Sequence, residues 1–248
     1  MLKLFDFSIS LIITSVLTLA LMGSSYILPM FLQNIRGYTA METGVIMLPS
    51  ALVMGVLMPI SGKMFDKMGA KPLVIPGLMI LGISSYELAN TINTNTSKEY
   101  IILVTCIRSI GLGLAMMPIS TAGMNAVKTE LVSRASALNN TIRQVSGALA
   151  VTIMSTIMQG RSDYNYAKLA EQINVYNKAS NDLLTTLTSA YMHSGMPQSM
   201  AKVSAVSKLT QIIKMQATID GMQYAVMVTV AAVAVALALT FFMRTKRI

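Results

Sequence analysis

A short basic loop decides the fold of this chain: Gly62-Lys63-Met64-Phe65-Asp66-Lys67-Met68-Gly69-Ala70-Lys71. It separates two long apolar runs, and further runs lie on both sides of these. Six runs of membrane-spanning length fall near residues 8–32, 42–61, 72–91, 99–122, 137–159 and 220–243. One helix needs about 20 apolar residues to cross about 30 Å of hydrocarbon. The sequence therefore predicts an all-α integral membrane protein with six transmembrane helices.

The composition agrees with this prediction. Hydrophobic residues make up 54% of the 248 residues and charged residues only 12%, with a mean hydropathy of +0.61. A soluble fold of this composition would leave a large apolar surface in water. The runs lack the alternation of membrane strands, which indicates helices. The first run is too long for a signal peptide and begins at Asp6, so we expect it to remain as a span.

The distribution of basic residues predicts the orientation, because short cytoplasmic loops carry the excess of Lys and Arg. Nine basic residues fall on one side of the predicted spans: Lys3, Lys63, Lys67, Lys71, Lys128, Arg134, Arg244, Lys246 and Arg247. The short loops on the other side carry only Arg36 and Lys98. We therefore expect both termini in the cytoplasm. The formal charge of +9 then needs no nucleic-acid partner to explain it.

Enzymatic chemistry is not indicated. The single cysteine, Cys106, lies within a span, and the single histidine, His193, lies in a loop. Neither has the neighbours that a nucleophile or a zinc site requires. No carboxylate pair and no phosphate-binding glycine loop accompanies the spans. We expect no catalytic residue, no metal site and no cofactor.

Ionisable residues inside spans are the sharpest candidates, because a charged residue there costs about 2.5 to 3.5 kcal/mol on insertion scales. Arg108 lies about 13 Å from the outer end of its span; it either lines a cavity or gate, which we favour, or bridges helices. Met116, on the same span, is assigned to the same cavity. Glu87 is the only carboxylate well inside a span, and it either takes part in proton coupling or pairs with Arg108.

Two further sets of residues have alternative interpretations. On the first span, Met22, Ser25 and Tyr26 share a face that either lines a substrate cavity or packs against another helix. The 22 methionines suit a surface that accepts varied apolar shapes, or they fill the core and face lipid. For Arg143 we favour a structural role. It is assigned to a helix interface with three residues of the same span: Asn139, Gln144 and Gly147.

The connection between the fifth and sixth spans is long and polar, so we expect it outside the cell. Apolar positions recur at three-to-four spacing in two series, which predicts two amphipathic helices: Tyr166, Leu169, Ile173, Tyr176, Leu183, Leu184 and Leu187, then Met200, Val203, Val206, Leu209 and Ile213. Ser194-Gly195-Met196-Pro197 separates the two series. The predicted domains are residues 1–160 (spans one to five), 161–218 (an extracellular helical hairpin) and 219–248 (span six and tail). The hairpin is either a lid or a solvated addition.

The basic loop resembles a known signature. Its pattern Gly-x-x-x-Asp-Lys-x-Gly-x-Lys resembles the cytoplasmic loop of the major facilitator superfamily, although Ala70 stands where a basic residue is common. That resemblance implies a latch between inward-open and outward-open states. The latch residues would be Gly62, Asp66, Lys67, Gly69 and Lys71. It also implies one six-helix bundle whose first and last three helices are inverted repeats.

Two more segments resemble the C-terminal bundle of the fourteen-helix drug:proton antiporters of the EmrB/QacA group, namely Arg108–Gly113 with Pro118, and Ser133–Gly147. The resemblance implies a bacterial plasma-membrane exporter of amphipathic drug-like molecules, driven by the proton gradient. It also implies that an N-terminal half, or a second copy, is needed as partner besides membrane lipid. The alternative is a truncated remnant or scaffold subunit that does not transport.

Overall fold

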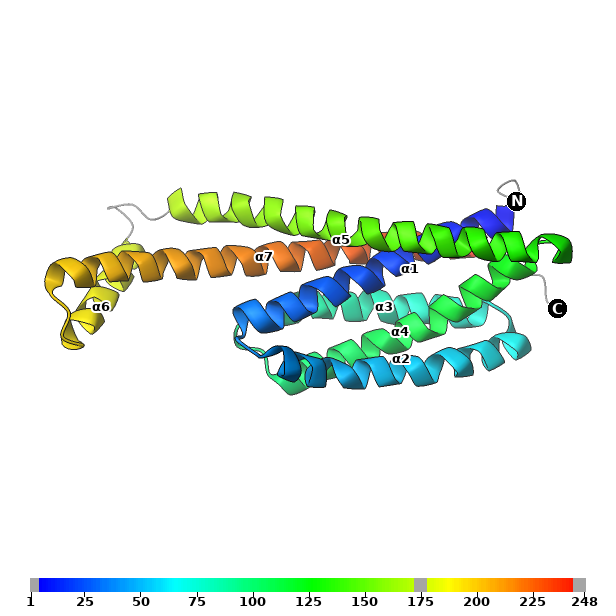
Figure 1. The fold of residues 1–248 in the computed structure, drawn as a ribbon, viewed down its shortest axis with the longest axis horizontal. Coiled ribbons are helices and arrows are strands. Elements are labelled where there is room, and N and C mark those ends of the chain that lie inside the picture. The colour runs from blue at the N-terminus through cyan, green and yellow to red at the C-terminus, as the bar shows by residue number, and fades with distance from the viewer. Residues whose placement is uncertain (1–4, 172–177, 243–248) are drawn as a thin grey trace. The chain divides into compact units, whose positions relative to one another are not determined.

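The computed structural model describes residues 5–171 and 178–242, and within these ranges all regular structure is helical (Figure 1). The long helices are α1 (Phe5–Met30), α2 (Ala40–Met68), α3 (Lys71–Thr91), α4 (Lys98–Asn125), α5 (Val132–Glu171), α6 (Lys178–His193) and α7 (Gln198–Phe242). A short π-helix, η1 (Phe31–Ile35), continues α1, and a 3-10 turn, η2 (Thr129–Leu131), precedes α5. The predicted all-α class is confirmed for the described residues.

The chain forms two units. The first comprises residues 1–155 and 225–248, and the second comprises residues 156–224. Both boundaries fall inside continuous helices, since α5 and α7 each contribute to both units. The predicted domain limits at 160 and 218 lie close to these boundaries, but the side of the membrane on which residues 161–218 lie stays a prediction.

In the first unit, α4 is the central helix and packs against α1, α2 and α3. Glycine permits the close approach of α3 and α4. A Cβ atom built on Gly111 would lie 2.6 Å from the backbone nitrogen of Leu81 and 2.7 Å from the carbonyl oxygen of Gly77. Backbone atoms cannot yield to such a clash, so the crossing of α3 and α4 requires glycine at this position. Close approach at small residues is how membrane helices gain packing energy without a hydrophobic driving force.

Local sequence explains where the helices of this unit begin and end. At the start of α2, Thr39 Oγ1 accepts from the backbone N–H of Glu42 at 3.2 Å, and Glu42 Oε2 accepts from the backbone N–H of Thr39 at 2.8 Å. This reciprocal pair is a capping box. At the end of α2, Gly69 has a φ of 79°, which glycine adopts without steric cost. The chain therefore turns sharply into α3.

Within residues 5–171 and 178–242, five helices are long and apolar enough to cross a membrane: Phe7–Ile35, Ala40–Met68, Lys71–Thr91, Lys98–Asn125 and Gln198–Phe242. They contain five of the six predicted spans. The remaining predicted span, 137–159, lies in α5 and is not among them, because polar residues such as Asn140 and Gln144 dilute its apolar character. Six spans therefore stay a prediction.

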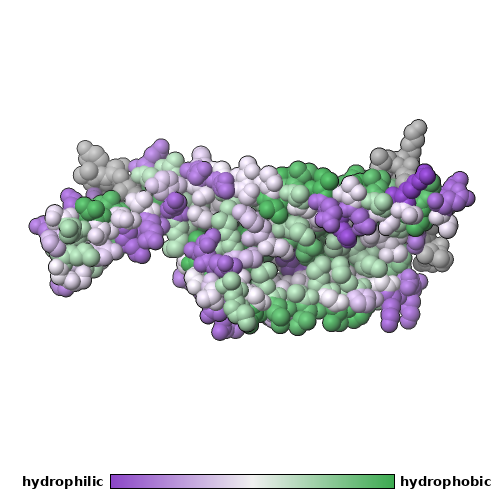
Figure 2. Space-filling model, in the orientation of Figure 1, coloured by the Kyte–Doolittle hydropathy of each residue, from purple (hydrophilic) through white to green (hydrophobic). Residues whose placement is uncertain are grey.

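The most exposed of these spans is α2. Large apolar side chains stand on its free surface, including Val45, Leu48, Leu52 and Val56. In Figure 2 this helix, at the lower edge of the view, forms a strongly hydrophobic margin. Such a surface is unfavourable in water and suits contact with lipid or with another protein. Exposed apolar helices of this length make the chain a multi-pass membrane protein.

In the second unit, the predicted break at Ser194-Gly195-Met196-Pro197 is confirmed, because α6 ends at His193 and α7 begins at Gln198. The predicted buried face of the following helix is wrong in part. Ala201, Ala205 and Leu209 are buried, whereas the larger predicted positions Met200, Val203 and Val206 are exposed. Small side chains face inward because the helices approach closely. At Gly221 of α7, an added Cβ would lie 2.5 Å from the carbonyl oxygen of Met158 in α5.

The first predicted amphipathic helix is divided between the end of α5 and α6. Two of its apolar positions, Ile173 and Tyr176, lie outside the described residues. Of the basic residues that predicted the orientation, Lys3, Arg244, Lys246 and Arg247 also lie outside them. The remaining basic residues on that predicted side, Lys63, Lys67, Lys71, Lys128 and Arg134, fall in or beside the connections from α2 to α3 and from α4 to α5.

Candidate functional site

Arg108 lies in the interior of the first unit. Its side chain is only 6% exposed, and it makes hydrogen bonds to two other helices. Nε donates to Ser85 Oγ of α3 at 3.1 Å, and Nη2 donates to the carbonyl oxygen of Ala20 in α1 at 2.5 Å. One guanidinium group on α4 therefore ties three helices together at about the middle of the fourth span.

The surroundings of Arg108 are mostly apolar. The core beside it is built from α1, α2, α3, α4 and the C-terminal part of α7, with Leu17, Leu81, Leu112 and Val233 as representative members. The Ala20 carbonyl also accepts from Ser24 Oγ at 3.1 Å. The guanidinium bridges helices, and both alternatives for Arg108, a structural bridge or a role in a cavity or gate, stay predictions.

The charge of Arg108 has no acidic partner within residues 5–171 and 178–242. In those ranges the ion pair found is between Lys98 and Glu99, at 3.9 Å, and both of its side chains are exposed. The buried polar and charged side chains there are otherwise all Ser or Thr. A buried charge held only by neutral acceptors has a substantial desolvation cost. A residue retained at such a cost inside a membrane protein is a functional candidate.

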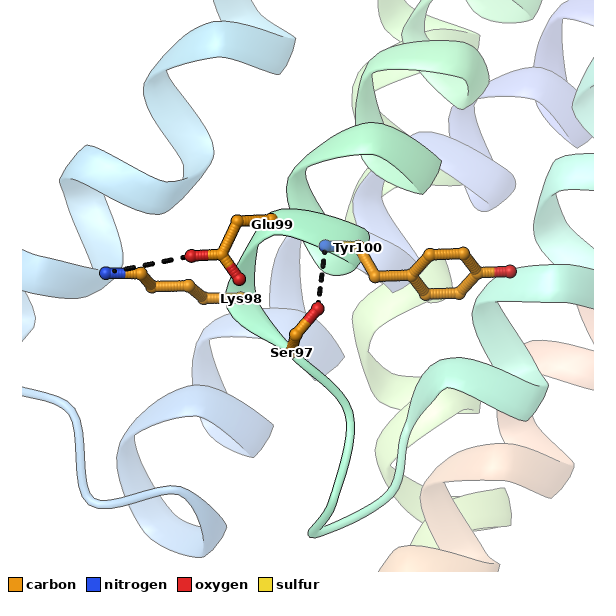
Figure 3. Close-up of polar contacts among 4 residues, drawn as sticks. All are labelled: Ser97, Lys98, Glu99 and Tyr100. Carbon is orange, nitrogen blue, oxygen red and sulfur yellow. Dashed lines mark hydrogen bonds and ion pairs between the residues drawn. The ribbon is translucent and has the colours of Figure 1, made fainter.

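Glu87 lies at a different place from Arg108, where α3 meets the beginning of α4. Its Oε1 accepts from the hydroxyl of Tyr100 at 2.5 Å, so it joins α3 to the beginning of α4. Figure 3 shows this beginning: Ser97 caps the helix by accepting from the backbone N–H of Tyr100 at 3.3 Å, and the Tyr100 ring points away from Lys98 and Glu99. Among the described residues, no ion pair joins Glu87 to Arg108. Its role in proton coupling stays a prediction.

The predicted cavity residues of the first span are only partly brought together with Arg108. Met22 is 38% exposed and lies beside Gly147 of α5, whose added Cβ would be 3.6 Å from Met22 Cγ. Ser25 is exposed and donates to the carbonyl of Leu21 in its own helix, and Tyr26 is half-buried. Met116 is buried in the core that flanks Arg108. These positions form no single lined surface that the structure identifies.

The predicted latch loop contains one long-range hydrogen bond. Lys71 Nζ donates to the carbonyl oxygen of Phe241 at 3.1 Å and so satisfies a free carbonyl at the end of α7. Lys67 and Asp66 are exposed, and no described residue of a neighbouring helix makes a hydrogen bond or ion pair with Asp66. At Gly62 the contact is ordinary, since an added Cβ would lie 3.8 Å from Met117. The tight helix contacts lie at Gly77 and Gly111 instead.

The predicted interface residues of α5 divide into two kinds. Asn139 Nδ2 donates to Ser120 Oγ of α4 at 3.3 Å and therefore packs inside the unit. Arg143 is exposed, and its Nη2 donates to Asn140 Oδ1 in the same helix at 3.1 Å. Gln144 is exposed as well. Among the described residues, Arg143 does not bridge to a second helix, in contrast to Arg108.

Comparison with known proteins identifies the family. Residues 2–151 match the Major Facilitator Superfamily, over more than half of the chain. The chain belongs to the major facilitator superfamily. The superfamily consists of transporters, which agrees with the prediction that the chain is not an enzyme.

Individual relatives of this major facilitator protein are named as transporters or resistance proteins. It is 31% identical to the uncharacterized MFS-type transporter YhcA of Bacillus subtilis, over 97% of the chain and 45% of the relative. It is 35% identical to the lincomycin resistance protein LmrB of the same species, over 64% of the chain and 33% of the relative. The multidrug export protein EmrB of Haemophilus influenzae is 26% identical, over 75% and 38% respectively. The chain spans less than half the length of these relatives.

Sequence reasoning missed the partners of Arg108 in this major facilitator protein. Ser85 carried a usable signal, because Ser84 and Ser85 interrupt an otherwise apolar run at a depth similar to that of Arg108. The second partner, Ala20, carried no such signal in the sequence. Ala20 contributes a backbone carbonyl, and every residue has a backbone carbonyl, so only the packing of α1 against α4 selects it.

Proposed function

We propose that the chain is the C-terminal six-helix bundle of a proton-coupled multidrug efflux transporter of the fourteen-helix group, working by alternating access. The observation that carries the proposal is Arg108, a buried charge that links α1, α3 and α4 without an acidic partner in the described residues. The named relatives that confer lincomycin resistance or export drugs support the same substrate class. Amphipathic drug-like molecules are the proposed cargo, and the proton gradient is the proposed energy source, with no cofactor.

The proposed partner is an N-terminal half or a second copy of the chain. The length of the relatives supports this, since the chain accounts for 45% of YhcA. The surface of α5 also supports it, because Asn140, Thr141, Arg143 and Gln144 are exposed within the predicted span. Polar side chains at membrane depth are unfavourable against lipid and are normally covered by protein or by a water-filled cavity. A second bundle facing α5 would provide that cover.

The proposed location is the plasma membrane of a bacterium, with lipid around the spans and both termini cytoplasmic. We also propose that residues 161–218 extend outside the cell. The length of α7 supports this, because its 45 residues would measure about 68 Å at 1.5 Å per residue. A hydrocarbon core of about 30 Å accommodates less than half of that length. The remainder would carry the hairpin into the outer aqueous phase.

The decisive experiment measures drug-triggered proton movement in everted membrane vesicles. One preparation contains the full chain alone, a second contains the chain with an N-terminal half from a full-length relative, and a third contains the empty vector. The proposal expects a signal from the combined preparation that Arg108→Ala abolishes and Arg143→Ala leaves intact, with equal protein in the membrane. Equal export by the Arg108→Ala variant would remove Arg108 from the mechanism.

Alternating access has its own test in the same preparation. If the 62–71 loop is a latch, Asp66→Asn slows turnover more than it weakens drug binding. Turnover is followed by the rate of proton movement, and binding by fluorescence of a bound dye. Unchanged turnover with lowered affinity would argue against the latch.

A second candidate function is a remnant or scaffold subunit that keeps the fold without transporting. The exposed apolar face of α2 favours it, because such a face suits a subunit that packs against other membrane proteins. This candidate predicts no drug-triggered proton movement in any vesicle preparation, including the combined one. The chain should still co-purify with other membrane proteins.

A further inference from the structure

The turn between α6 and α7 carries an unusual set of exposed side chains. Met192, Met196 and Met200 recur at four-residue spacing and are 40%, 40% and 64% exposed. His193, the only histidine of the chain, is exposed beside them. Apolar thioether side chains gain nothing from exposure to water, and the predicted core of this hairpin is filled by smaller residues instead. What distinguishes this cluster from other exposed methionines, such as Met41 and Met79, is the histidine beside it.

We propose that this turn binds a soft monovalent cation, Cu(I) or Ag(I). The ligands are three thioether sulfurs and one imidazole nitrogen: Met192, Met196, Met200 and Nε2 of His193. Thioether sulfur is a soft ligand that prefers Cu(I) over hard cations, and imidazole completes such a site. The inference does not depend on transport activity, because all four ligands lie in the second unit, between Met192 near the end of α6 and Met200 in the first turn of α7. It also replaces the expectation of no metal site, which had considered only zinc-type ligands.

A hydrogen bond holds the imidazole of His193 in the tautomer that can bind a metal through Nε2. His193 Nδ1 lies 2.8 Å from the carbonyl oxygen of Ser189, and a carbonyl oxygen can only accept. In the neutral ring, Nδ1 therefore carries the proton, and Nε2 presents its lone pair. A carbonyl that orients the non-ligating nitrogen of a histidine is a common second partner at metal sites.

The backbone of the turn is ordered by its own hydrogen bonds. The N–H of Met196 donates to the carbonyl of Tyr191 at 3.2 Å, and the N–H of Gly195 donates to the carbonyl of Met192 at 3.0 Å. Together with the φ of 89° at Gly195, this pattern is a Schellman motif. The segment that joins Met192 to Met200 is thus held in a defined conformation by its own hydrogen bonds.

The methionine side chains can meet. Ser204 Oγ lies 3.9 Å from Met196 Sδ, so the Met196 side chain extends along α7. Met200 and Ser204 are four residues apart and share a face of that helix. The sulfur of Met196 therefore lies over the face that carries Met200. Three rotatable bonds allow each thioether to turn toward one ion.

Zinc does not fit the same segment. Within the described residues, no group of three or more His, Cys, Asp or Glu side chains is placed to hold a metal. Zinc prefers thiolate, imidazole and carboxylate ligands, and only one of those, His193, is present here. Zinc is therefore a selective negative control.

The test uses the full chain in detergent, in a Cys106→Ser background that removes the competing thiol. Cu(I), maintained by ascorbate without oxygen, is distributed between the protein and the chelator bathocuproine disulfonate. The parent should retain about one equivalent. The variant M192L/M196L/M200L, in which leucine conserves volume, should lose more than about tenfold in affinity, and His193→Ala should lose a similar factor, since even ligand-supporting groups change metal affinity 10- to 100-fold.

Two matched controls make the result specific. The variant M41L/M68L/M79L removes three exposed methionines from the first unit and should bind Cu(I) like the parent. Zn(II) should not be retained by any variant. Equal Cu(I) retention by the parent and by M192L/M196L/M200L would overturn the proposal. Equal losses in the two triple variants, or retention of Zn(II) that depends on these methionines, would overturn it as well.

Discussion

The two arginines of the predicted spans occupy opposite environments. Arg108 of α4 is buried and donates to α1 and α3, whereas Arg143 of α5 is exposed and donates only to Asn140 of its own helix. Both residues interrupt apolar sequence, and an arginine inside a membrane span is costly to insert at either position. The comparison indicates that the neighbours of a helix, and not the arginine alone, decide whether a charge inside a span becomes structural or functional. The central helix places its arginine against one acceptor on α1 and one on α3, and α5 leaves its arginine exposed.

The largest expected effect is on the contact that holds α4 in place. Gly111→Ala should lower the free energy of unfolding by about 3 kcal/mol or more, because the new Cβ meets the backbone of Leu81 and Gly77. The measurement is SDS-induced unfolding in mixed micelles. Gly55→Ala is the control: nothing lies within 4 Å of that position, so alanine should stabilise α2 by about 0.5–1 kcal/mol. Equal stability of the two variants would contradict the proposed crossing.

The second effect separates the arginines by function. Arg108→Ala should reduce proton-linked drug export to background in vesicles that contain both halves, whereas Arg143→Ala should keep more than about half of it. The protein level in the membrane is measured by immunoblot for each variant. A fall in export of similar size for both would erase the distinction between the two sites.

The third effect concerns the partner of Arg108. Ser85→Ala leaves the Nε donor without its acceptor, and an unpaired buried donor costs about 1–3 kcal/mol. Unfolding in mixed micelles should show that loss. Ser25→Ala removes a hydroxyl bonded only within its own helix and should change stability by less than about 0.5 kcal/mol. A neutral Ser85→Ala variant would mean that Arg108 does not depend on α3.

The smallest effect is expected on α5. Asn140→Ala removes the partner of Arg143, and because both side chains are exposed the free energy of unfolding should change by less than about 0.5 kcal/mol. The same micelle unfolding assay applies. A loss above about 1 kcal/mol would show that the surface of α5 is already covered in the isolated chain.

Much of the fold was accessible from the sequence. Apolar runs of sufficient length predicted the helices, and five of the six predicted spans lie within helices able to cross a membrane. Local signals such as Gly69 and Gly195 marked turns correctly, because a positive φ strongly favours glycine. The hairpin was less accessible. Its buried face consists of Ala201, Ala205 and Leu209, and a search for large apolar residues overlooks alanine.

Hydrophobic length and local turn chemistry act over a few residues, so the order of amino acids is enough to predict a helical membrane protein with a family signature between its second and third apolar runs. The surroundings of the candidate residues depend on the packing of helices that are distant in the sequence. Arg108 meets Ser85 and the Ala20 carbonyl across sequence separations of 23 and 88 residues. Glu87 meets Tyr100 instead of Arg108. Such contacts between side chains depend on how closely the helices approach, and small residues distributed over several helices set that approach.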